Sequence, residues 1–308
     1  MDLDLYLALA GLVVGFTVGL TGMGGGALMT PILVLVFKVQ PLAAVSSDLV
    51  AAVVMKPIGG GVHLRRGTVN IKLVRWLVCG SVPSAFAGVL LLKAMGEGAE
   101  LQDRIKSVLG VALLVAASAI VAKSWVQRHR GGANGTVAGV DVRPAPTVLI
   151  GVIGGLVVGM TSVGSGSLMI VMLLVLYPTL TSSQLVGTDL VQAIPLVASA
   201  AAGHLLFGDF DLNVTTSLLL GSVPGVYLGA RLSARSPEHI IRPALVAVLA
   251  LSGLKLVGVS DMTLGIALAV ALAGGVAYAV RAWLGAPSRS DERSRGTAAA
   301  APDGTLSR

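Results

Sequence analysis

Long apolar stretches alternate with short polar connections along most of the chain. Apolar runs cover residues 5–21, 26–39, 42–64, 71–94 and 104–122, then 148–162, 166–178, 182–204, 213–231 and 239–258, and finally 262–284. Because about 20 mostly apolar residues are needed to cross a bilayer as a helix, the pattern predicts an all-α polytopic membrane protein with about eight to eleven helices. Runs 26–39 and 166–178 are short, so each is predicted to be a tilted helix or a half-helix that re-enters the membrane.

Composition agrees with a membrane protein. Of the 308 residues 55% are hydrophobic and 12% are charged, whereas soluble domains carry about 25% charged residues. The 40 glycines are typical of membrane helices whose backbones approach closely. A net charge of +7 does not indicate a nucleic-acid partner, because the basic residues lie between apolar runs and in the tail. Cys79 is the one cysteine, which excludes an internal disulfide and a Cys-based metal site; no cofactor or metal is indicated.

Two polar segments divide the chain. Residues 124–146 are polar and Gly-rich and are predicted to form a linker, and residues 286–308 are predicted to be a disordered tail. The expected organisation is therefore a first transmembrane repeat (1–123), a cytoplasmic linker (124–146), a second transmembrane repeat (147–260), an additional transmembrane helix (261–285) and a disordered cytoplasmic tail (286–308).

The two predicted repeats share an ordered set of motifs. The segment 21–29 resembles the segment 161–169, Asp48-Leu49-Val50 returns as Asp189-Leu190-Val191, and Gly80-Ser81-Val82-Pro83 returns as Gly221-Ser222-Val223-Pro224. The order is kept at an offset of 140 or 141 residues throughout. This regularity indicates a tandem duplication followed by one extra helix.

The charges of matching connections predict opposite orientations for the repeats. The connection after run 42–64 is basic (Arg65, Arg66, Lys72 and Arg75), whereas its counterpart after run 182–204 carries Asp209 and Asp211. Five runs per repeat, an odd number, reverse the orientation if each run crosses the membrane. The positive-inside rule then predicts two inverted-topology repeats in a bacterial inner (plasma) membrane, with the N-terminus outside and the C-terminus in the cytoplasm.

Two polar stretches between a full run and a short run are the candidate substrate-binding segments. Broken helices of this kind leave helix N-termini facing a cavity, where free N–H groups and the helix dipole attract anions. The alternative is that the glycines only permit a turn or close packing. The candidate residues are Thr21, Gly22, Gly24, Gly25 and Gly26 in the first stretch, and Thr161, Ser162, Gly164, Ser165, Gly166 and Ser167 in the second.

Charged residues within apolar runs are the other candidates. Asp48 and Asp189 match across the repeats, and each is either a coupling or gating group or a cap at the start of its helix. Lys56 shares a helical face with His63 and lies close to the face of Asp48. It either contributes to substrate binding or extends toward the cytoplasmic end of its helix.

Two histidines end matching runs. His63 and His204 are expected at the membrane interface with hydrogen bonds to backbone, and a role in proton relay or gating is the alternative.

The ordered motifs, from the Gly-rich segment 15–26 through Ser46-Ser47-Asp48 and the segment 63–67 to Gly80-Ser81-Val82-Pro83, resemble the TauE/SafE sulfite exporter family, also called the toluene-sulfonate uptake permease family or DUF81. The resemblance covers about residues 5–258. It implies a bacterial inner-membrane carrier for sulfite, thiosulfate, sulfonates or sulfonated carboxylates, with export assigned more often than uptake.

We therefore expect a secondary transporter, and more specifically an exporter of small sulfur-containing anions, that works by alternating access at the repeat interface. Its expected partners are the anion, the lipid bilayer and, without a residue-level argument, a second copy of the chain. The alternative is a proton- or sodium-coupled carrier of another small solute that uses Asp48 and Asp189. An enzyme is disfavoured because the sequence lacks His-Glu-x-x-His, Gly-x-Ser-x-Gly and Cys-pair motifs. A scaffold would not need duplicated polar breaks.

Overall fold

The computed structural model describes residues 4–21, 25–96, 98–129, 141–207, 210–232, 238–260 and 262–263. The regular secondary structure of these residues is helical, and they form no β-strand. The helices are α1 (Leu5–Thr21), α2 (Gly26–Leu35), α3 (Pro41–Arg65), α4 (Ile71–Ala94), α5 (Gly98–His129), α6 (Pro144–Thr161), α7 (Leu168–Leu176), α8 (Ser182–Phe207), α9 (Leu212–Leu232) and α10 (Glu238–Leu256). All ten belong to one compact unit, residues 1–260.

The ten runs predicted within residues 1–260 are confirmed as helices. Among the described residues, α3, α4, α6, α8 and residues 98–125 of α5 are long and apolar enough to cross a membrane. The two runs predicted to be short form the two shortest helices, α2 and α7. The last predicted run, 262–284, lies almost wholly outside the described residues, as does the predicted tail.

The prediction that residues 124–146 are a linker without helix is wrong at both ends. Helix α5 continues to His129, because no helix-breaking residue occurs before Gly131 and Gly132. Helix α6 begins at Pro144, since proline is favoured in the first turn, where its missing N–H is not needed. Residues 130–140, in the middle of this segment, lie outside the described residues.

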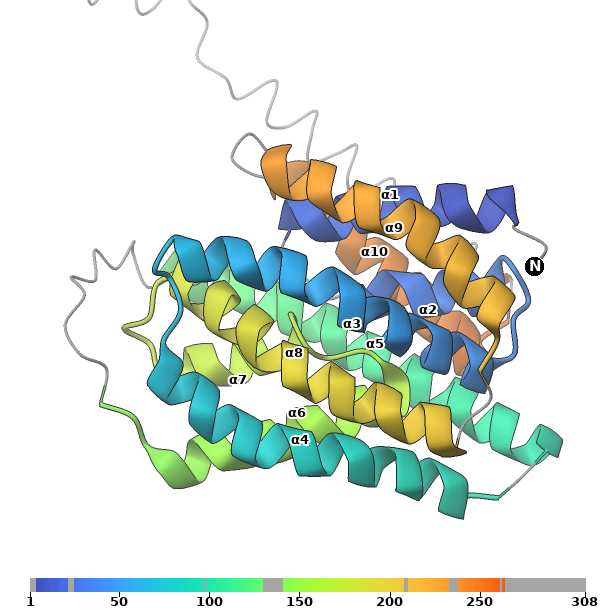
Figure 1. The fold of residues 1–308 in the computed structure, drawn as a ribbon, viewed down its shortest axis with the longest axis horizontal. Coiled ribbons are helices and arrows are strands. Elements are labelled where there is room, and N and C mark those ends of the chain that lie inside the picture. The colour runs from blue at the N-terminus through green and yellow to red at the C-terminus, as the bar shows by residue number, and fades with distance from the viewer. Residues whose placement is uncertain are drawn as a thin grey trace, which may run out of the picture. The chain divides into compact units, whose positions relative to one another are not determined.

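Glycines allow α1 to pack on α9 and α4 to pack on α6, in each case across the two repeats and in the same direction (Figure 1). Along the first pair, Gly11 faces Leu218, and Gly19 faces Ala230. Along the second pair, Gly80 faces Val152 and Gly88 faces Met160. Backbones this close leave no room for larger side chains at the glycines.

The remaining long helices pair with their own counterparts. Helices α3 and α8 run antiparallel, with Ser46 beside His204 and Gly60 beside Val191. Helices α5 and α10 also run antiparallel where Gly110 meets Val257 and Leu114 meets Gly253. Each helix of one repeat therefore has a contact that its counterpart in the other repeat reproduces.

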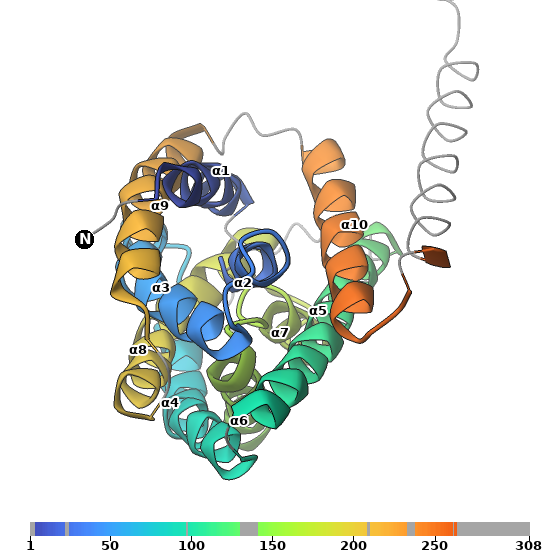
Figure 2. The ribbon, with the colours of Figure 1, turned by 90° about the vertical axis from the view of Figure 1, so that its right-hand side faces the viewer.

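The short helices lie inside the unit. Seen along the bundle, α2 and α7 are enclosed by the longer helices (Figure 2). Both helices bury large side chains completely, among them Met29 in α2 and Met169 in α7. The starts of α2 and α7 are consequently held in the interior of the unit.

Substituting Gly15 with alanine should destabilise the protein. A Cβ at this position would lie 2.8 Å from the backbone Cα of Ser222, so α1 and α9 would have to separate. We expect Gly15→Ala to lower the free energy of unfolding by about 1–3 kcal/mol. Thermal unfolding of the detergent-purified protein measures this change.

Gly61→Ala is the matched control, because no atom lies within 4 Å of a Cβ placed on this helical glycine of α3. Alanine favours the helix by up to about 1 kcal/mol, so this variant should be as stable as the parent or more stable. Equal stability losses in both variants would contradict the proposed role of the α1–α9 contact.

Candidate functional site

The chain breaks sharply between α6 and α7. Ser162 follows α6 with a φ of 58°, and Gly164 and Gly166 have φ values of 125° and 90°. Glycine adopts positive φ without steric cost, which explains its use at two of these positions. A single β-bridge joins Gly164 to Gly166, so the break is a compact turn that ends at Ser167, before the first residue of α7.

The corresponding break between α1 and α2 is described only in part. The candidate residues Gly22 and Gly24 lie outside the described residues. Gly25 is buried before α2, and Gly26 lies so close to Ser162 that a Cβ on it would overlap the Ser162 carbonyl oxygen. The structure therefore brings together the two candidate stretches, one from each repeat.

Asp48 lies where these breaks meet. Its side chain is 1% exposed, and its Oδ2 accepts hydrogen bonds from Thr30 Oγ1 at 2.8 Å and from Ser162 Oγ at 2.7 Å. The helix-cap interpretation is wrong, because α3 begins at Pro41, about two turns before Asp48, and α8 begins at Ser182, equally far before Asp189. The Asp48 carboxylate instead links α2, α3 and the α6–α7 break.

Lys56 lies about two turns after Asp48 on α3 and is 7% exposed. Its Nζ donates a hydrogen bond to Ser165 Oγ, and its charge interacts with both Asp48 and Asp189. The interpretation that Lys56 extends to the cytoplasmic end of its helix is therefore wrong. The side chain instead lies in the interior, against the α6–α7 break.

Asp189 is the matching carboxylate on α8 and is also 1% exposed. Its Oδ1 accepts a hydrogen bond from Gln192 Nε2 at 3.1 Å, and the carboxylate also interacts with the backbone N–H of Gly166. Among the described residues its Oδ2 has no hydrogen-bond partner, and neither does the buried hydroxyl of Ser167. Unlike Asp48, this carboxylate is left with an unused acceptor in the interior.

We call Asp48, Lys56 and Asp189 the charged triad. With all three groups ionised it carries two negative charges and one positive charge, all buried. A buried charge without compensation is costly. The triad can therefore hold a proton or a small cation at the carboxylates, while Lys56 and the starts of α2 and α7 favour an anion.

The hydroxyl groups of Thr161 and Thr21 have different surroundings. Thr161 Oγ1 donates to the Val157 carbonyl and accepts from the Val163 N–H, which fixes the turn. Thr21 lines a small cavity together with Ser165, Gly166 and Ser167. This cavity has about 10 Å³ open to the centres of water-sized molecules, room for roughly one water.

The two histidines occupy unlike environments. His204 is fully buried, with Nδ1 2.8 Å from Ser46 Oγ and Nε2 2.8 Å from the Gly159 carbonyl oxygen. The expected hydrogen bond to backbone is present for His204, and its position at the membrane interface stays a prediction. His63 is half-buried at the end of α3 and contacts Thr68 Oγ1 at 2.9 Å. Among the described residues, neither histidine forms a hydrogen bond or an ion pair with the triad.

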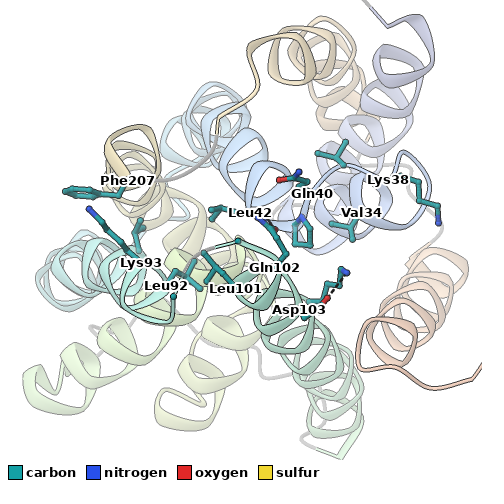
Figure 3. Close-up of a pocket in the computed structure, with 17 residues that line it drawn as sticks. Val34, Lys38, Gln40, Leu42, Leu92, Lys93, Leu101, Gln102, Asp103 and Phe207 are labelled. Carbon is teal, nitrogen blue, oxygen red and sulfur yellow. Dashed lines mark hydrogen bonds and ion pairs between the residues drawn. The ribbon is translucent and has the colours of Figure 1, made fainter.

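A larger cleft opens at the end of the unit where α3 begins and α4 ends. We call it the lysine cleft (Figure 3). Its volume is about 830 Å³, and its walls come from α2, α3, α4, α5 and α8 together with the connections between them. The charged residues described on its walls are Lys38, Lys93, Lys106 and Asp103. No residue of this cleft was among the sequence candidates.

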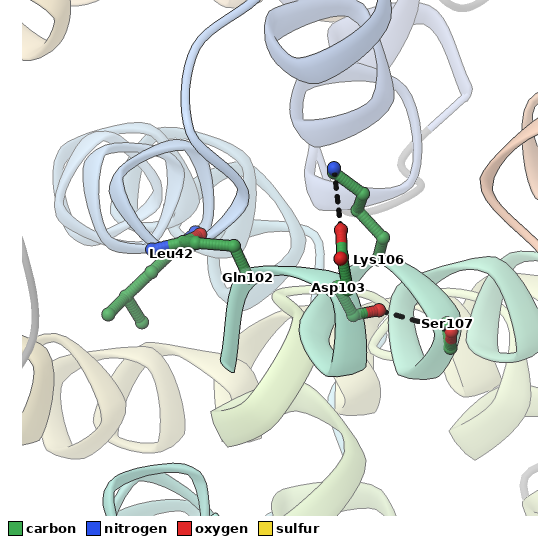
Figure 4. A network of polar contacts seen from close by, with 5 residues as sticks. All are labelled: Leu42, Gln102, Asp103, Lys106 and Ser107. Atoms are coloured by element: carbon green, nitrogen blue, oxygen red, sulfur yellow. Dashed lines mark hydrogen bonds and ion pairs between the residues drawn. The ribbon is translucent and has the colours of Figure 1, made fainter. Parts of the chain in front are cut away.

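Polar contacts tie α3 and α5 together at this cleft (Figure 4). Gln102 Oε1 accepts a hydrogen bond from the Leu42 backbone N–H at 3.1 Å. Lys106 Nζ lies 2.9 Å from Asp103 Oδ1, and Ser107 Oγ donates to the Asp103 carbonyl at 3.1 Å. The start of α3 is thereby anchored to the first turns of α5.

The sequence profile of the family described as "Sulfite exporter TauE/SafE" matches residues 7–256. The chain belongs to the TauE/SafE family. Among its relatives, the probable membrane transporter protein YjnA of Bacillus subtilis is 38% identical over 83% of this chain and 100% of that protein. The probable membrane transporter protein YdhB of the same organism is 23% identical over 83% of this chain and 99% of that protein. No solved structure matches the chain.

Two polar residues of this TauE/SafE chain were missed at the sequence level. Thr30 and Gln192 are fully buried and bind Asp48 and Asp189, respectively. Their positions in the sequence could have indicated them. Gln192 is a polar residue within an apolar run, three positions after Asp189, and Thr30 lies within another apolar run, one turn after Gly26.

Electrostatic coupling within the triad should appear in a double-mutant cycle. Lys56→Met leaves two buried carboxylates without their cation and should destabilise the protein by about 3–5 kcal/mol. Adding Asp189→Asn removes one of those charges and should recover part of the loss, with a coupling energy of about 0.5–3 kcal/mol. Thermal unfolding in detergent gives all four corners of the cycle.

The same cycle with Lys72→Met in place of Lys56→Met is the control, because Lys72 is exposed at the start of α4. It should show no coupling to Asp189. Additive effects of Lys56→Met and Asp189→Asn would contradict the proposed charge balance.

Proposed function

We propose that the protein is a secondary transporter of small sulfur-containing anions, such as sulfite, thiosulfate or organosulfonates. The observation that carries the proposal is the buried ammonium group of Lys56 beside Ser165, at the meeting point of two helix breaks. Helix starts, hydroxyl groups and an ammonium are donors that suit oxyanions. The family's description as sulfite exporters supports this substrate class, and the names of both relatives support membrane transport.

We propose further that the two repeats have inverted topology in the membrane. Support comes from the antiparallel pairing of α3 with α8 and of α5 with α10, which are matching helices of the two repeats. With the N-terminus outside, the basic residues Arg65 and Arg66 after α3 and the start of α6 lie on the cytoplasmic side. The lysine cleft then lies at the outer end.

Alternating access follows from this arrangement. The proposed site is built from α2 and α3 of one repeat and from the α6–α7 break of the other. A movement between the repeats would separate these donors and release the anion. Export fits the membrane potential, because each negative charge that leaves an inside-negative cell gains about 2.3 kcal/mol per 100 mV.

Ligand-dependent thermal stability tests the anion class and the site together. Sulfite, thiosulfate, taurine, sulfoacetate, phosphate, acetate and chloride are each added to the detergent-purified protein. An anion that binds the folded protein at a hundred times its Kd should stabilise it by about 2.7 kcal/mol. We expect a shift with a sulfur oxyanion or sulfonate that is lost in Lys56→Gln.

Lys72→Gln is the matched control and should keep the shift, because Lys72 is exposed and lies outside the triad. No shift with any anion would refute the proposed substrate class. A shift that persists in Lys56→Gln would refute the site but not the class.

A proton- or sodium-coupled carrier is the second candidate function. It is favoured by one observation, the buried Oδ2 of Asp189, which has no hydrogen-bond partner in the part of the chain that the structure describes. A proton or a sodium ion on this carboxylate would remove the excess negative charge of the triad. The same ion would then move with the anion, or with another small solute, through the site.

Transport in proteoliposomes under imposed ion gradients distinguishes the coupled mechanism. If Asp189 carries the coupling ion, Asp189→Asn should make transport independent of the pH or sodium gradient that drives the parent protein. The anion-induced thermal shift should remain. Asp103→Asn, which removes an exposed carboxylate of α5, should retain the gradient dependence. Equal gradient dependence in the parent and Asp189→Asn would eliminate Asp189 as the coupling group.

A further inference from the structure

The lysine cleft has a charge pattern that membrane insertion does not explain. This argument rests on the topology proposed above, which places the cleft at the outer end of the unit. Outer connections are usually poor in lysine and arginine. Three separate segments nevertheless bring Lys38, Lys93 and Lys106 to the walls of one cleft, against the single described carboxylate of Asp103.

Local roles account for these lysines only in part. Lys38 follows α2 and Lys93 lies in the last turn of α4, and a cation at the C-terminal end of a helix interacts favourably with the helix dipole. Lys106 forms an ion pair with Asp103. Lys38 has a φ of 57°, and the backbone N–H of Val39 after it donates a hydrogen bond to the Leu33 carbonyl at 3.0 Å, so this left-handed residue belongs to the end of α2. None of these local roles requires that the three lysines meet at one cleft.

Lys93 is held in place on the opposite side of the cleft (Figure 3). Its Nζ lies 4.6 Å from the centre of the Phe207 ring, and that ring packs edge-on against Phe86 with centroids 6.1 Å apart. A cation–π contact positions the ammonium while leaving its N–H donors available to other groups. Two lysines on facing walls can therefore attract the same ligand.

The floor of the cleft is apolar. Leu42, Leu92 and Leu101 line the cleft, and together with the fully buried Ile105 they form a separate apolar cluster of α3, α4 and α5. Ser46, one turn below Leu42 on α3, is completely buried. The cluster thus separates the cleft from the interior, where the charged triad lies.

We propose that the lysine cleft is the outer vestibule of the transport pathway, where Lys38, Lys93 and Lys106 attract small multiply charged oxyanions. The apolar cluster beneath it is the outer gate, which is closed in this structure. Anions leaving the site pass this gate, and anions arriving from outside gather above it. The lysines set the local concentration of anions at the gate by long-range attraction rather than by tight binding.

Cysteine labelling measures the electrostatic potential in the cleft directly. Cys79→Ser gives a cysteine-free background, because Cys79 is the one cysteine of the chain. Ala99→Cys then places a thiol on the cleft wall, and Asn213→Cys places an exposed thiol at the start of α9, outside the cleft. The protein in neutral detergent is treated with methanethiosulfonate reagents that carry a negative or a positive head group.

For each cysteine we compare the labelling rate with the anionic reagent to the rate with the cationic reagent. This ratio should be at least about threefold higher at Ala99→Cys than at Asn213→Cys. This preference should fall to the control value when Lys38→Gln, Lys93→Gln and Lys106→Gln are combined, and it should decrease with added salt. Sulfate should slow labelling by a neutral reagent more than chloride does at equal ionic strength. Equal preferences at both sites, or no effect of the three substitutions, would overturn the vestibule.

The gate has its own test. Ile105→Cys places a thiol in the buried part of the apolar cluster. It should be labelled at least about tenfold more slowly than Ala99→Cys by the same neutral reagent, and labelling at equal rates would overturn the gate. These measurements need no transported substrate, so failure of the vestibule is distinguishable from failure of the proposed function, which the anion-induced thermal shift tests.

Discussion

Burying the ammonium group of Lys56 inside a bundle of apolar helices requires partners, because an isolated charge in such surroundings is strongly disfavoured. The protein supplies these partners from distant parts of the chain. Ser165 accepts its hydrogen bond, and Asp48 and Asp189 provide opposite charges from two matching helices. Thr30 and Ser162 then donate hydrogen bonds to the carboxylate of Asp48. The position of the α6–α7 break is thus tied to the middle of α3.

Close helix packing makes this assembly sterically feasible. Glycines at the α1–α9 and α4–α6 contacts bring backbones together, and Gly26 allows α2 to start against the Ser162 carbonyl. Such contacts compensate for the weak hydrophobic driving force between helices within lipid. The same small residues that were ambiguous in the sequence, between packing and substrate binding, therefore do at least the packing in this structure.

The sequence predicted the architecture better than the site. Apolar length is a strong signal, so the ten helices and the two breaks were predictable from residues 5–258 alone. The cap interpretation of Asp48 failed because the polar residues around it were weighed above Pro41, whose position in the first turn marks the true start of α3. The burial of Lys56 could not be predicted, because it depends on where α3 begins and on how the α6–α7 break places Ser165 against α3. The lysine cleft joins segments that are far apart in the chain, and no local pattern indicates such a meeting.

The pairing of α1 with α9 has a consequence for how the protein is made. About 200 residues separate these helices, so α1 lacks its main packing partner until nearly all of the unit has been synthesised. Native contacts this distant in sequence form slowly, because the intervening chain must first be ordered. The glycine-lined faces of α1 and α4 are exposed to lipid during that interval. Neither repeat contains the main packing partner of its own first helix. A chain that stops after the first repeat therefore lacks a complete fold. Folding of the unit is then completed only after the second repeat has been synthesised.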